Sequence, residues 1–274
     1  MSQRTGQVAV VTGAASGIGE ALGRAFAGQG MSVMLADIHL EQLDAVAEEM
    51  RRGGGAVATS RVDVANASAV EGLAQRTLAD FGRVDVVCNN AGVLVRGAVA
   101  DTPDEDWRWA FDVHFWGMLY GVRAFLPILQ EQGSGHIFNT CSMSALISSP
   151  FSAPYVASKA AAMALTESLF LELKTSNVAV SLLLPETVAT NLAQAELSRP
   201  ERYGRSHADD GMIQATHRAF QESGTAPDDV AARVLEALES KRFWILPPTE
   251  DPMMQFALER QHRLELREDP RSIF

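Results

Sequence analysis

A glycine-rich turn near the start of the chain constrains its fold more than any other feature. The run from Thr12 to Gly19, TGAASGIG, follows an apolar stretch and leads directly into a helical pattern. Glycine has no Cβ, so the backbone can turn sharply and approach a phosphate, which the N–H groups opening the next helix then face. This strand–turn–helix context predicts a dinucleotide-binding loop. Its candidate binding residues are Gly13, Ser16, Gly17, Ile18 and Gly19.

Strand-like and helical stretches alternate along the whole chain. The strand-like runs are mostly continuous in apolar residues, as in parallel strands that are buried on both faces. Between them lie stretches with helical spacing, the longest of which is Asp104–Glu131. The alternation predicts an α/β fold, a single-domain Rossmann-like doubly wound parallel sheet with helices on both faces. The expected strands are Gln7–Thr12, Ser32–Ala36, Ala56–Arg61, Val84–Asn89, His136–Thr140, Val178–Leu184 and Phe243–Leu246.

Length and composition favour one domain over residues 1–274. A chain of 274 residues with 47% apolar and 21% charged residues can bury a large core, and no repeat or Pro/Gly/Ser-rich linker divides it. Residues 186–225 interrupt the alternation after a late strand, so we expect a substrate lid there, with a flexible surface excursion as the alternative. The C-terminal extension 247–274 is either a helix packed on a second subunit or a solvated end.

The net charge of the chain limits the classes of partner that it can bind. Lys and Arg number 23 and Asp and Glu number 34, so the formal net charge is −11. Such a chain repels phosphate backbones and anionic lipid, which argues against nucleic-acid and membrane partners. No run of 18 apolar residues and no signal-peptide pattern occur, and the two cysteines, Cys88 and Cys141, are too few for a disulfide framework. We therefore expect a cytoplasmic protein, and no histidine spacing predicts a metal site.

An acidic residue, Asp37, ends the second expected strand. A carboxylate at this place can accept the ribose hydroxyls of the adenosine half of NAD, and it repels the 2′-phosphate of NADP. Neither the glycine loop nor Ile38 supplies a cation to offset that repulsion, and His39 is mostly neutral at pH 7. NAD is therefore the expected cofactor, with NADP less favoured. Asp37 could also cap the helical stretch that starts near Leu40.

Tyr155 and Lys159 form the candidate acid–base pair. They are four residues apart in a helical stretch, so they share one face of the helix. A free tyrosine has a pKa near 10, and a neighbouring lysine ammonium favours the phenolate and lowers that pKa. Tyr155 can then take the hydroxyl proton of an alcohol while a hydride leaves the carbinol carbon.

Together these motifs resemble the short-chain dehydrogenase/reductase family. The resemblance rests on the glycine loop, Asp63-Val64, Asn89-Asn-Ala-Gly92, Ser142 and Tyr155-Val-Ala-Ser-Lys159, and it is close over about residues 5–190. It implies an oxidoreductase that transfers a hydride between a secondary alcohol or ketone and NAD(H). By this resemblance Ser142 hydrogen-bonds the substrate oxygen, where it could otherwise only cap a turn, and Lys159 also holds the nicotinamide ribose. The other cofactor contacts that the resemblance implies are Asp63, Val64, Asn90, Ala91, Gly92, Pro185, Val188 and Thr190.

Two residues depart from the family pattern. His114 replaces an asparagine that anchors a water in a proton relay, so it either holds that water in a pH-sensitive relay or merely replaces a structural hydrogen bond. Glu186 replaces a glycine after Pro185. It either tunes substrate choice at the mouth of the site or points to solvent, and we expect the latter.

The expected substrate is apolar, cyclic or aryl. The residues expected to line its pocket are Leu94, Ser144, Phe151, Glu186 and Leu192. The longest helical stretch carries Trp109 and Trp116 and is apolar nearly all round, so it should be buried on two sides, by the core and by either the lid or a second subunit. Since the family commonly pairs this helix across an interface, we expect a homodimer or homotetramer.

Two other functions remain open. An NADPH-dependent 3-oxoacyl-carrier-protein-type reductase shares these motifs, but a chain of charge −11 repels acidic carrier proteins. A non-catalytic dinucleotide-sensing protein on the same fold would not need Ser142, Tyr155 and Lys159 together.

Overall fold

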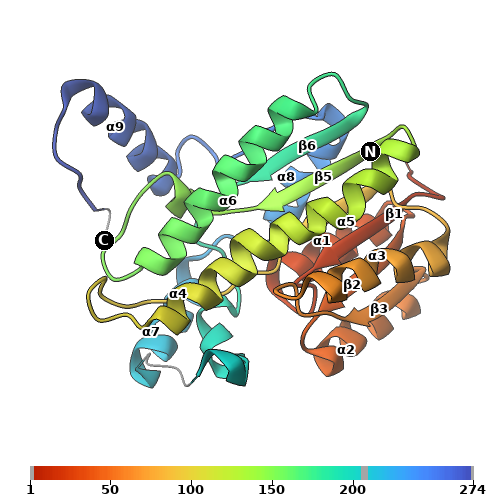
Figure 1. The fold of residues 1–274 in the computed structure, drawn as a ribbon, viewed down its shortest axis with the longest axis horizontal. Helices are drawn as coiled ribbons and strands as arrows, with labels where there is room; N and C mark the ends of the chain where they lie inside the picture. Colours follow the sequence, from red (N-terminus) through yellow and green to blue (C-terminus); the bar gives the residue numbers. More distant parts are fainter. Residues whose placement is uncertain (1–2, 205–208, 273–274) are drawn as a thin grey trace.

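One parallel sheet runs through the centre of the protein (Figure 1). The computed structural model describes residues 3–204 and 209–272, and each strand begins and ends within two residues of its predicted run. The strands are β1 (Val8–Thr12), β2 (Ser32–Asp37), β3 (Val57–Arg61), β4 (Val86–Asn89), β5 (Gly135–Thr140), β6 (Val178–Leu183) and β7 (Trp244–Ile245). Their order is β3-β2-β1-β4-β5-β6-β7, so the direction of strand addition reverses between β1 and β4. A ligand crevice forms at the carboxyl ends of the strands at such a switch point.

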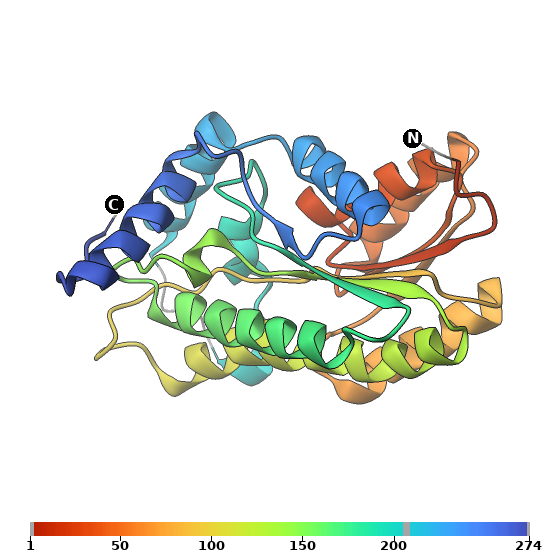
Figure 2. The same cartoon turned by 90° about the horizontal axis from the view of Figure 1, so that it is seen from above.

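Helices cover both faces of the sheet, and an apolar layer fills the space on each side (Figure 2). Phe26 and Leu35 belong to one layer and Phe125 and Ile137 to the other, and all four are almost completely buried. This confirms the predicted doubly wound α/β fold. In the described ranges, no helix is both long enough and apolar enough to span a membrane. The helices on one face are α1 (Gly17–Gly28), α2 (Leu40–Arg52) and α8 (Pro227–Ser240), and those on the other are α3 (Ala67–Phe81), α5 (Gly117–Glu131) and α6 (Ala153–Glu172).

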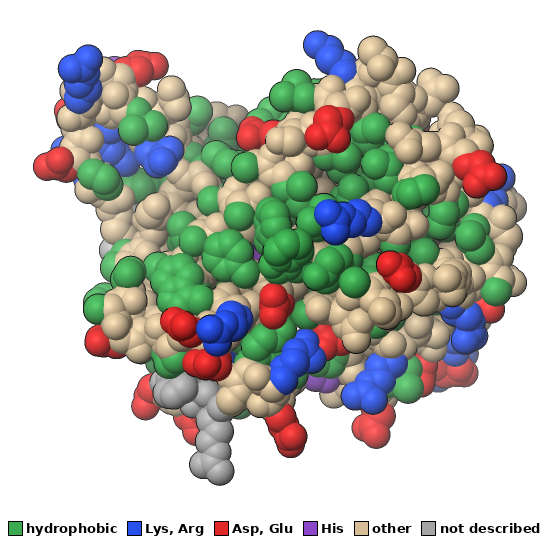
Figure 3. Space-filling model, viewed as in Figure 1, with side chains coloured by type: hydrophobic (Ala, Val, Ile, Leu, Met, Phe, Trp, Pro, Cys, Tyr) green, Lys and Arg blue, Asp and Glu red, His purple; other side chains and the backbone are tan. Residues whose placement is uncertain are grey.

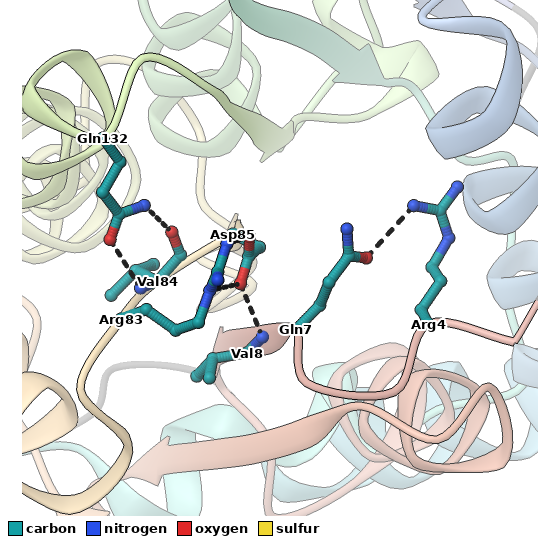
Figure 4. Close-up of polar contacts among 7 residues, drawn as sticks. All are labelled: Arg4, Gln7, Val8, Arg83, Val84, Asp85 and Gln132. Atoms are coloured by element: carbon teal, nitrogen blue, oxygen red, sulfur yellow. Dashed lines mark hydrogen bonds and ion pairs between the residues drawn. The ribbon is translucent and has the colours of Figure 1, made fainter.

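A polar cluster joins the amino ends of β1 and β4, at the edge of the sheet opposite the crevice (Figure 4). Asp85 accepts the Val8 backbone N–H at 2.9 Å and pairs with Arg83 through two hydrogen bonds of 2.7 and 2.8 Å. The side-chain amide of Gln132, just beyond α5, accepts the Val84 N–H at 3.1 Å and donates to the Val84 carbonyl. These bonds fix the position of β4 next to β1, and with it the geometry of the switch point.

The long helix predicted over Asp104–Glu131 is interrupted. It consists of α4 (Asp104–Phe111), a π-helical turn over Asp112–Trp116, and α5. The prediction of one regular helix is wrong because apolar periodicity over many residues does not reveal one wider turn. The π turn directs His114 into the core, where it is 1% exposed, and leaves Trp116 40% exposed.

The insertion after β6, for which a lid was predicted and which is called the lid below, lies against the cleft. It contains two 3₁₀ turns, Leu192–Ser198 and Glu201–Tyr203, followed by helix α7 (Asp210–Ser223). Positions 205–208 of the expected lid lie outside the described residues. Leu192, Met212 and Phe220 of this segment lie on the wall of the cleft.

One buried arginine anchors the lid to α4. The Arg199 side chain is 3% exposed, pairs with Asp106 of α4 and with Glu196 of the lid, and lies 4.9 Å from the Trp109 ring. Tyr203 packs on the same tryptophan, with 6.2 Å between ring centroids. The second side of the helix around Trp109 is therefore covered by the lid, one of the two coverings expected from the sequence.

The C-terminal extension begins as a helix on the core of the same chain. It forms α9 (Pro252–Leu266), whose first turn packs through Met253 and Met254 on the apolar cluster that contains Met143 of the same chain. Further along, Leu264 is exposed, and the helix projects from the body of the molecule (Figure 1).

Candidate active site

A cleft of about 1020 Å³ follows the carboxyl ends of the strands and continues beneath the lid. Of the residues predicted from the sequence, all except His114 and Phe151 lie on its wall. Those on the wall are Gly13, Ser16, Gly17, Ile18, Gly19, Asp37, Ile38, Asp63, Val64, Asn90, Ala91, Gly92, Leu94, Ser142, Ser144, Tyr155, Lys159, Pro185, Glu186, Val188, Thr190 and Leu192.

The glycine loop between β1 and α1 has a shape that requires glycine. Gly13 and Gly17 have φ values of +67° and +57°, in the left-handed region. A Cβ on Gly13 would lie 2.7 Å from the Ala91 Cα, and one on Gly17 would lie 2.9 Å from Thr190 Cγ2. Ser16 at the N-cap of α1 makes no side-chain cap hydrogen bond, so this helix start, on the cleft wall, keeps its N–H groups for a ligand. The loop therefore fits a pyrophosphate.

Asp37 is held at the edge of the cleft by the backbone around it. Its Oδ2 accepts the Ala15 N–H and its Oδ1 accepts the His39 N–H, both at 3.0 Å. The N-cap residue of α2 is His39, so Asp37 does not serve as that cap. The carboxylate is thus preoriented where a ribose would meet it.

A cation near Asp37 was not predicted from the sequence. Arg61, the last residue of β3, is aligned with Asp37 across the sheet and donates from Nε to the Ile38 carbonyl at 3.3 Å. Only the pairing of β3 with β2 brings it there, and it is not among the residues on the cleft wall.

Two asparagines after β4 join the strands at the switch point. Asn90 donates to the Thr12 carbonyl at 3.0 Å, and its own N–H is accepted by the Thr12 hydroxyl at 2.9 Å. Asn89 donates to the side chain of Asn139 in β5 at 2.9 Å. These bonds hold the loop after β4 against the glycine loop.

Ser142, Tyr155 and Lys159 come together as their spacing predicts. Tyr155 and Lys159 are both buried on one face of α6, and the lysine Nζ lies 5.9 Å from the centroid of the tyrosine ring. Ser142, just beyond β5, accepts the Ser144 N–H at 3.1 Å and also hydrogen-bonds Tyr155. Ser142 therefore caps a turn and reaches the tyrosine as well, so the two interpretations of this serine are compatible.

Burial controls the proton affinities of this group. Removal from water raises the pKa of Tyr155 to about 12, and the hydrogen bond with Ser142 opposes this only in part. Burial also lowers the pKa of Lys159 to about 8. The expected lowering of the tyrosine pKa by the lysine is absent in the chain by itself, and the pKa is raised because desolvation disfavours the phenolate.

His114 is a buried structural residue in this geometry. Its Nε2 accepts the Val93 N–H at 3.0 Å, and its Nδ1 lies 2.8 Å from Ser158 Oγ. Since Nε2 accepts, the neutral ring carries its proton on Nδ1 and donates it to Ser158. Both nitrogens are occupied, and burial holds the pKa well below 6.5. The expectation that His114 titrates near neutrality is therefore wrong.

His114 is nevertheless connected to the candidate base. Ser158 donates onward to the Tyr155 carbonyl at 3.0 Å, and the imidazole ring meets the Tyr155 ring edge-on with 5.4 Å between centroids. The histidine therefore links the loop after β4 to the first turns of α6.

Two predicted substrate residues are placed differently from expectation. The Glu186 side chain is 3% exposed and pairs with Arg233 of α8 at 2.7 Å, so it does not point to solvent. Phe151 has a φ of +56°, is 66% exposed and does not line the cleft.

Several wall residues were missed by the sequence analysis. The C-terminal helix contributes Met253 and the loop after β4 contributes Arg96, whereas Met212 and Phe220 belong to the segment that was predicted to line the pocket. Helical spacing could have shown that the apolar wall residues lie on a buried face of their helices. It could not have shown which surface that face packs against.

The structure offers no second chemistry beside the candidate group. Cys141 adjoins Ser142, but burial raises the pKa of its thiol to about 12, which keeps it protonated and unreactive. Across residues 3–204 and 209–272, no cluster of His, Cys, Asp and Glu is arranged to hold a metal ion.

Comparisons with known proteins give the family. The model of the short chain dehydrogenase family matches residues 7–201. The chain is 38% identical to a 1-deoxy-11-beta-hydroxypentalenate dehydrogenase of Streptomyces exfoliatus, over 87% of this chain and 82% of the relative. It is 32% identical to 3beta-hydroxysteroid dehydrogenase 2 of Eggerthella lenta, over 83% and 85%.

A solved structure agrees with this. A short chain dehydrogenase/reductase from Burkholderia phymatum in complex with NAD has a TM-score of 0.93, 36% identity and coverage of 100% of this chain and 99% of its own. The fold, the cleft and these similarities lead to one conclusion: the chain belongs to the short-chain dehydrogenase/reductase family and is an oxidoreductase.

Proposed function

We propose that this enzyme oxidises apolar, cyclic or aryl secondary alcohols with NAD, and reduces the matching ketones with NADH. The observation that carries the proposal is the meeting of Ser142, Tyr155 and Lys159 in a cleft that also contains the glycine loop and Asp37. Residues 1–274 act as one domain, with 186–225 as its substrate lid and 247–274 as an extension that helps to close the cleft.

The chain's own residues bind the cofactor along the cleft. The loop Gly13–Gly19 holds the pyrophosphate. Asp37 and Ile38 bind the adenosine ribose, and Asp63 and Val64 contact the adenine. Asn90, Ala91 and Gly92, in the loop after β4, lie over the adenosine ribose. The nicotinamide half is held by Lys159 of α6 and by Pro185, Val188 and Thr190 of the loop after β6.

Three residues carry the proton chemistry. When bound, NAD accepts a hydride from the carbinol carbon and brings a positive ring beside Tyr155. Tyr155 takes the hydroxyl proton of the alcohol, and in the reverse direction it protonates the carbonyl oxygen. Ser142 donates to that oxygen as charge develops on it, since its hydroxyl proton is not used in capping the turn. The Lys159 ammonium stabilises the phenolate.

The preference for NAD rests on Asp37. Its carboxylate lines the cleft and is held by two backbone N–H groups, so a 2′-phosphate would meet a fixed negative charge. Two arginines lie near this end of the cleft: Arg61 is bonded to the Ile38 carbonyl and Arg202 pairs with Asp63 at 2.6 Å, and neither lines the cleft.

An apolar substrate is supported by the wall near Tyr155. Leu94, Tyr155 and Ala193 form one buried cluster, and Leu192 and Phe220 of the lid pack against it. The names of two relatives, a hydroxypentalenate dehydrogenase and a hydroxysteroid dehydrogenase, are consistent with oxidation of a hydroxyl-bearing substrate.

A homodimer or homotetramer is supported by the outer face of α5 and α6. Figure 3 shows hydrophobic side chains gathered across this face, and Trp116 and Leu171 are 40% and 66% exposed. A cytoplasmic location is in keeping with the two cysteines being free thiols.

A dehydrogenase screen tests the proposed function. The full chain with NAD is offered a panel of cyclic, aryl and short aliphatic secondary alcohols, and NADH absorbance is recorded. We expect turnover of cyclic or aryl alcohols and little turnover of short aliphatic ones. Absence of turnover across the panel, in both directions and with both cofactors, would contradict the proposal.

A further inference from the structure

We propose that the substrate of this enzyme carries a carboxylate and that Arg96 binds it inside the cleft. The inference rests on the proposed function and refines it, because it specifies a second group on the alcohol. Arg96 is the arginine in the run VLVRG after β4, and it lies on the cleft wall.

The backbone directs Arg96 to the substrate side of this segment. Val93 and Val95 pack into a cluster with Trp109, whereas Leu94 belongs to the cluster that contains Tyr155. Successive residues of an extended segment point to opposite sides, so residues two apart share a side. Arg96 therefore lies on the same side of the segment as Leu94. Directly after Arg96, Gly97 donates its N–H to the Phe151 carbonyl at 3.0 Å, which ties the segment to the loop that enters α6.

The guanidinium of Arg96 has no counter-charge in the part of the chain that the structure describes. Its Nε is buried without a hydrogen-bond partner, and no ion pair involves the residue. Burial also lowers its pKa, with no neighbouring acid named among the causes. An arginine keeps its charge in a protein, so the cation is both partly desolvated and unneutralised.

The glutamates on the walls of the cleft and of the cavity that adjoins it already have partners. Glu186 on the cleft wall pairs with Arg233 at 2.7 Å, and Glu196 of the lid pairs with Arg199 at 3.3 Å. Arg96 also borders a small adjoining cavity beneath α7, whose wall includes Glu196 and Met212. The cleft therefore holds an uncompensated positive charge next to apolar side chains.

The chemistry of that position selects a carboxylate. A guanidinium presents a planar fork of N–H donors that matches the two oxygens of a carboxylate. Leu94, Met212 and Ile213 line the small cavity beside Arg96 and are apolar, and Arg96 is the only cation on the wall of that cavity among the described residues. The occupant inferred is thus an apolar hydroxy acid, with its hydroxyl at Tyr155 and its carboxylate at Arg96.

Matched substrates and variants test this inference. The probes are 3- and 4-hydroxycyclohexanecarboxylate and their methyl esters, which keep the ring and the hydroxyl but replace the negative charge by a methyl group. We expect the acids to exceed the esters in kcat/KM, and Arg96→Gln to lower the acid-to-ester ratio by roughly 10- to 100-fold, the effect of losing a charge-assisted hydrogen bond. Arg96→Lys should keep part of the acid-to-ester ratio of kcat/KM. The control Arg108→Gln changes an exposed arginine outside the cleft and should leave that ratio unchanged. Equal kcat/KM for acid and ester, or equal loss of both in Arg96→Gln, would overturn the inference.

A binding measurement separates this inference from the proposed function. Cyclohexanecarboxylate, which has no hydroxyl to oxidise, is titrated by calorimetry into the protein with NADH. Binding that weakens at least tenfold in Arg96→Gln supports the carboxylate site, even if no alcohol is turned over and the proposed function fails. Turnover of neutral alcohols without carboxylate binding would leave the proposed function intact and refute the role of Arg96.

Discussion

Arg233 of α8 donates from Nη2 to Glu186 Oε1 at 2.7 Å, and the two side chains are 15% and 3% exposed. The same arginine donates from Nη1 to the Leu246 carbonyl at 3.2 Å. One buried cation thus joins the loop after β6, helix α8 and the segment after β7. The carboxylate that replaces the family's glycine is a structural link beside the cleft.

Removing Arg233 should destabilise the fold strongly. Arg233→Met leaves the Glu186 carboxylate buried and unpaired, so we expect a loss of about 3–5 kcal/mol in the free energy of unfolding. Arg24→Met, which breaks pairs with the more exposed Glu20 and Glu49, should lower the free energy of unfolding much less, because water screens exposed ion pairs. Urea unfolding gives the free energy of unfolding of both variants. Equal losses would show that burial does not make the Glu186–Arg233 pair contribute more than an exposed pair.

The cofactor preference should follow Asp37. We expect NAD to bind at least about tenfold more tightly than NADP, because a fixed carboxylate meets the 2′-phosphate. Asp37→Ala should narrow that gap by weakening NAD and strengthening NADP. Fluorescence titration of both cofactors checks this, and equal affinities in the unsubstituted protein would rule out the assignment.

Tyr155 should be essential for turnover but not for folding or cofactor binding. Tyr155→Phe keeps the ring and removes the hydroxyl, so we expect kcat to fall at least about 100-fold while NAD affinity changes little. The readouts are NADH formation and cofactor titration on the same preparation. A variant that keeps more than about a hundredth of the rate would show that another group is the base. If the protein were a non-catalytic sensor, the unsubstituted chain itself would show no turnover.

His114 should not appear in the pH profile of turnover. Both ring nitrogens are bonded and the pKa lies well below 6.5, so His114→Asn should give a profile parallel to that of the unsubstituted enzyme around neutral pH. His114→Leu leaves the Val93 N–H and the Ser158 hydroxyl without this partner and should cost about 2–3 kcal/mol of stability. An inflection near the ordinary histidine pKa that vanishes in His114→Asn would restore the relay interpretation.

His136 should make the protein less stable as the pH falls. Burial lowers its pKa from 6.5 to about 3, so between these values the unfolded chain binds a proton that the folded chain does not. Stability from this residue is complete above about pH 6.5 and declines by up to about 1.4 kcal/mol per pH unit as the pH falls toward 3. Unfolding between about pH 7 and pH 5 should show a shallower decline in His136→Asn. An equal slope in both proteins would contradict the shift.

The architecture and the central site were predictable from local pattern. Parallel strands that are buried on both faces are continuous apolar runs, and the glycine loop lies within eight consecutive residues. Both can therefore be predicted without knowledge of tertiary contacts. Tyr155 and Lys159 are likewise one helical turn apart, which places them on the same face wherever the helix packs.

Only the tertiary structure decided what the isolated polar residues do. Glu186 meets Arg233 from α8, His114 meets Val93 and Ser158 from two other segments, and Arg96 meets no counter-charge in the described chain. The sequence by itself determined the sheet, the loop and the acid–base pair, because each depends on near neighbours in the chain. Whether a buried charge or imidazole is paired, bonded or left for a ligand depends on distant residues, which only folding brings within hydrogen-bond distance.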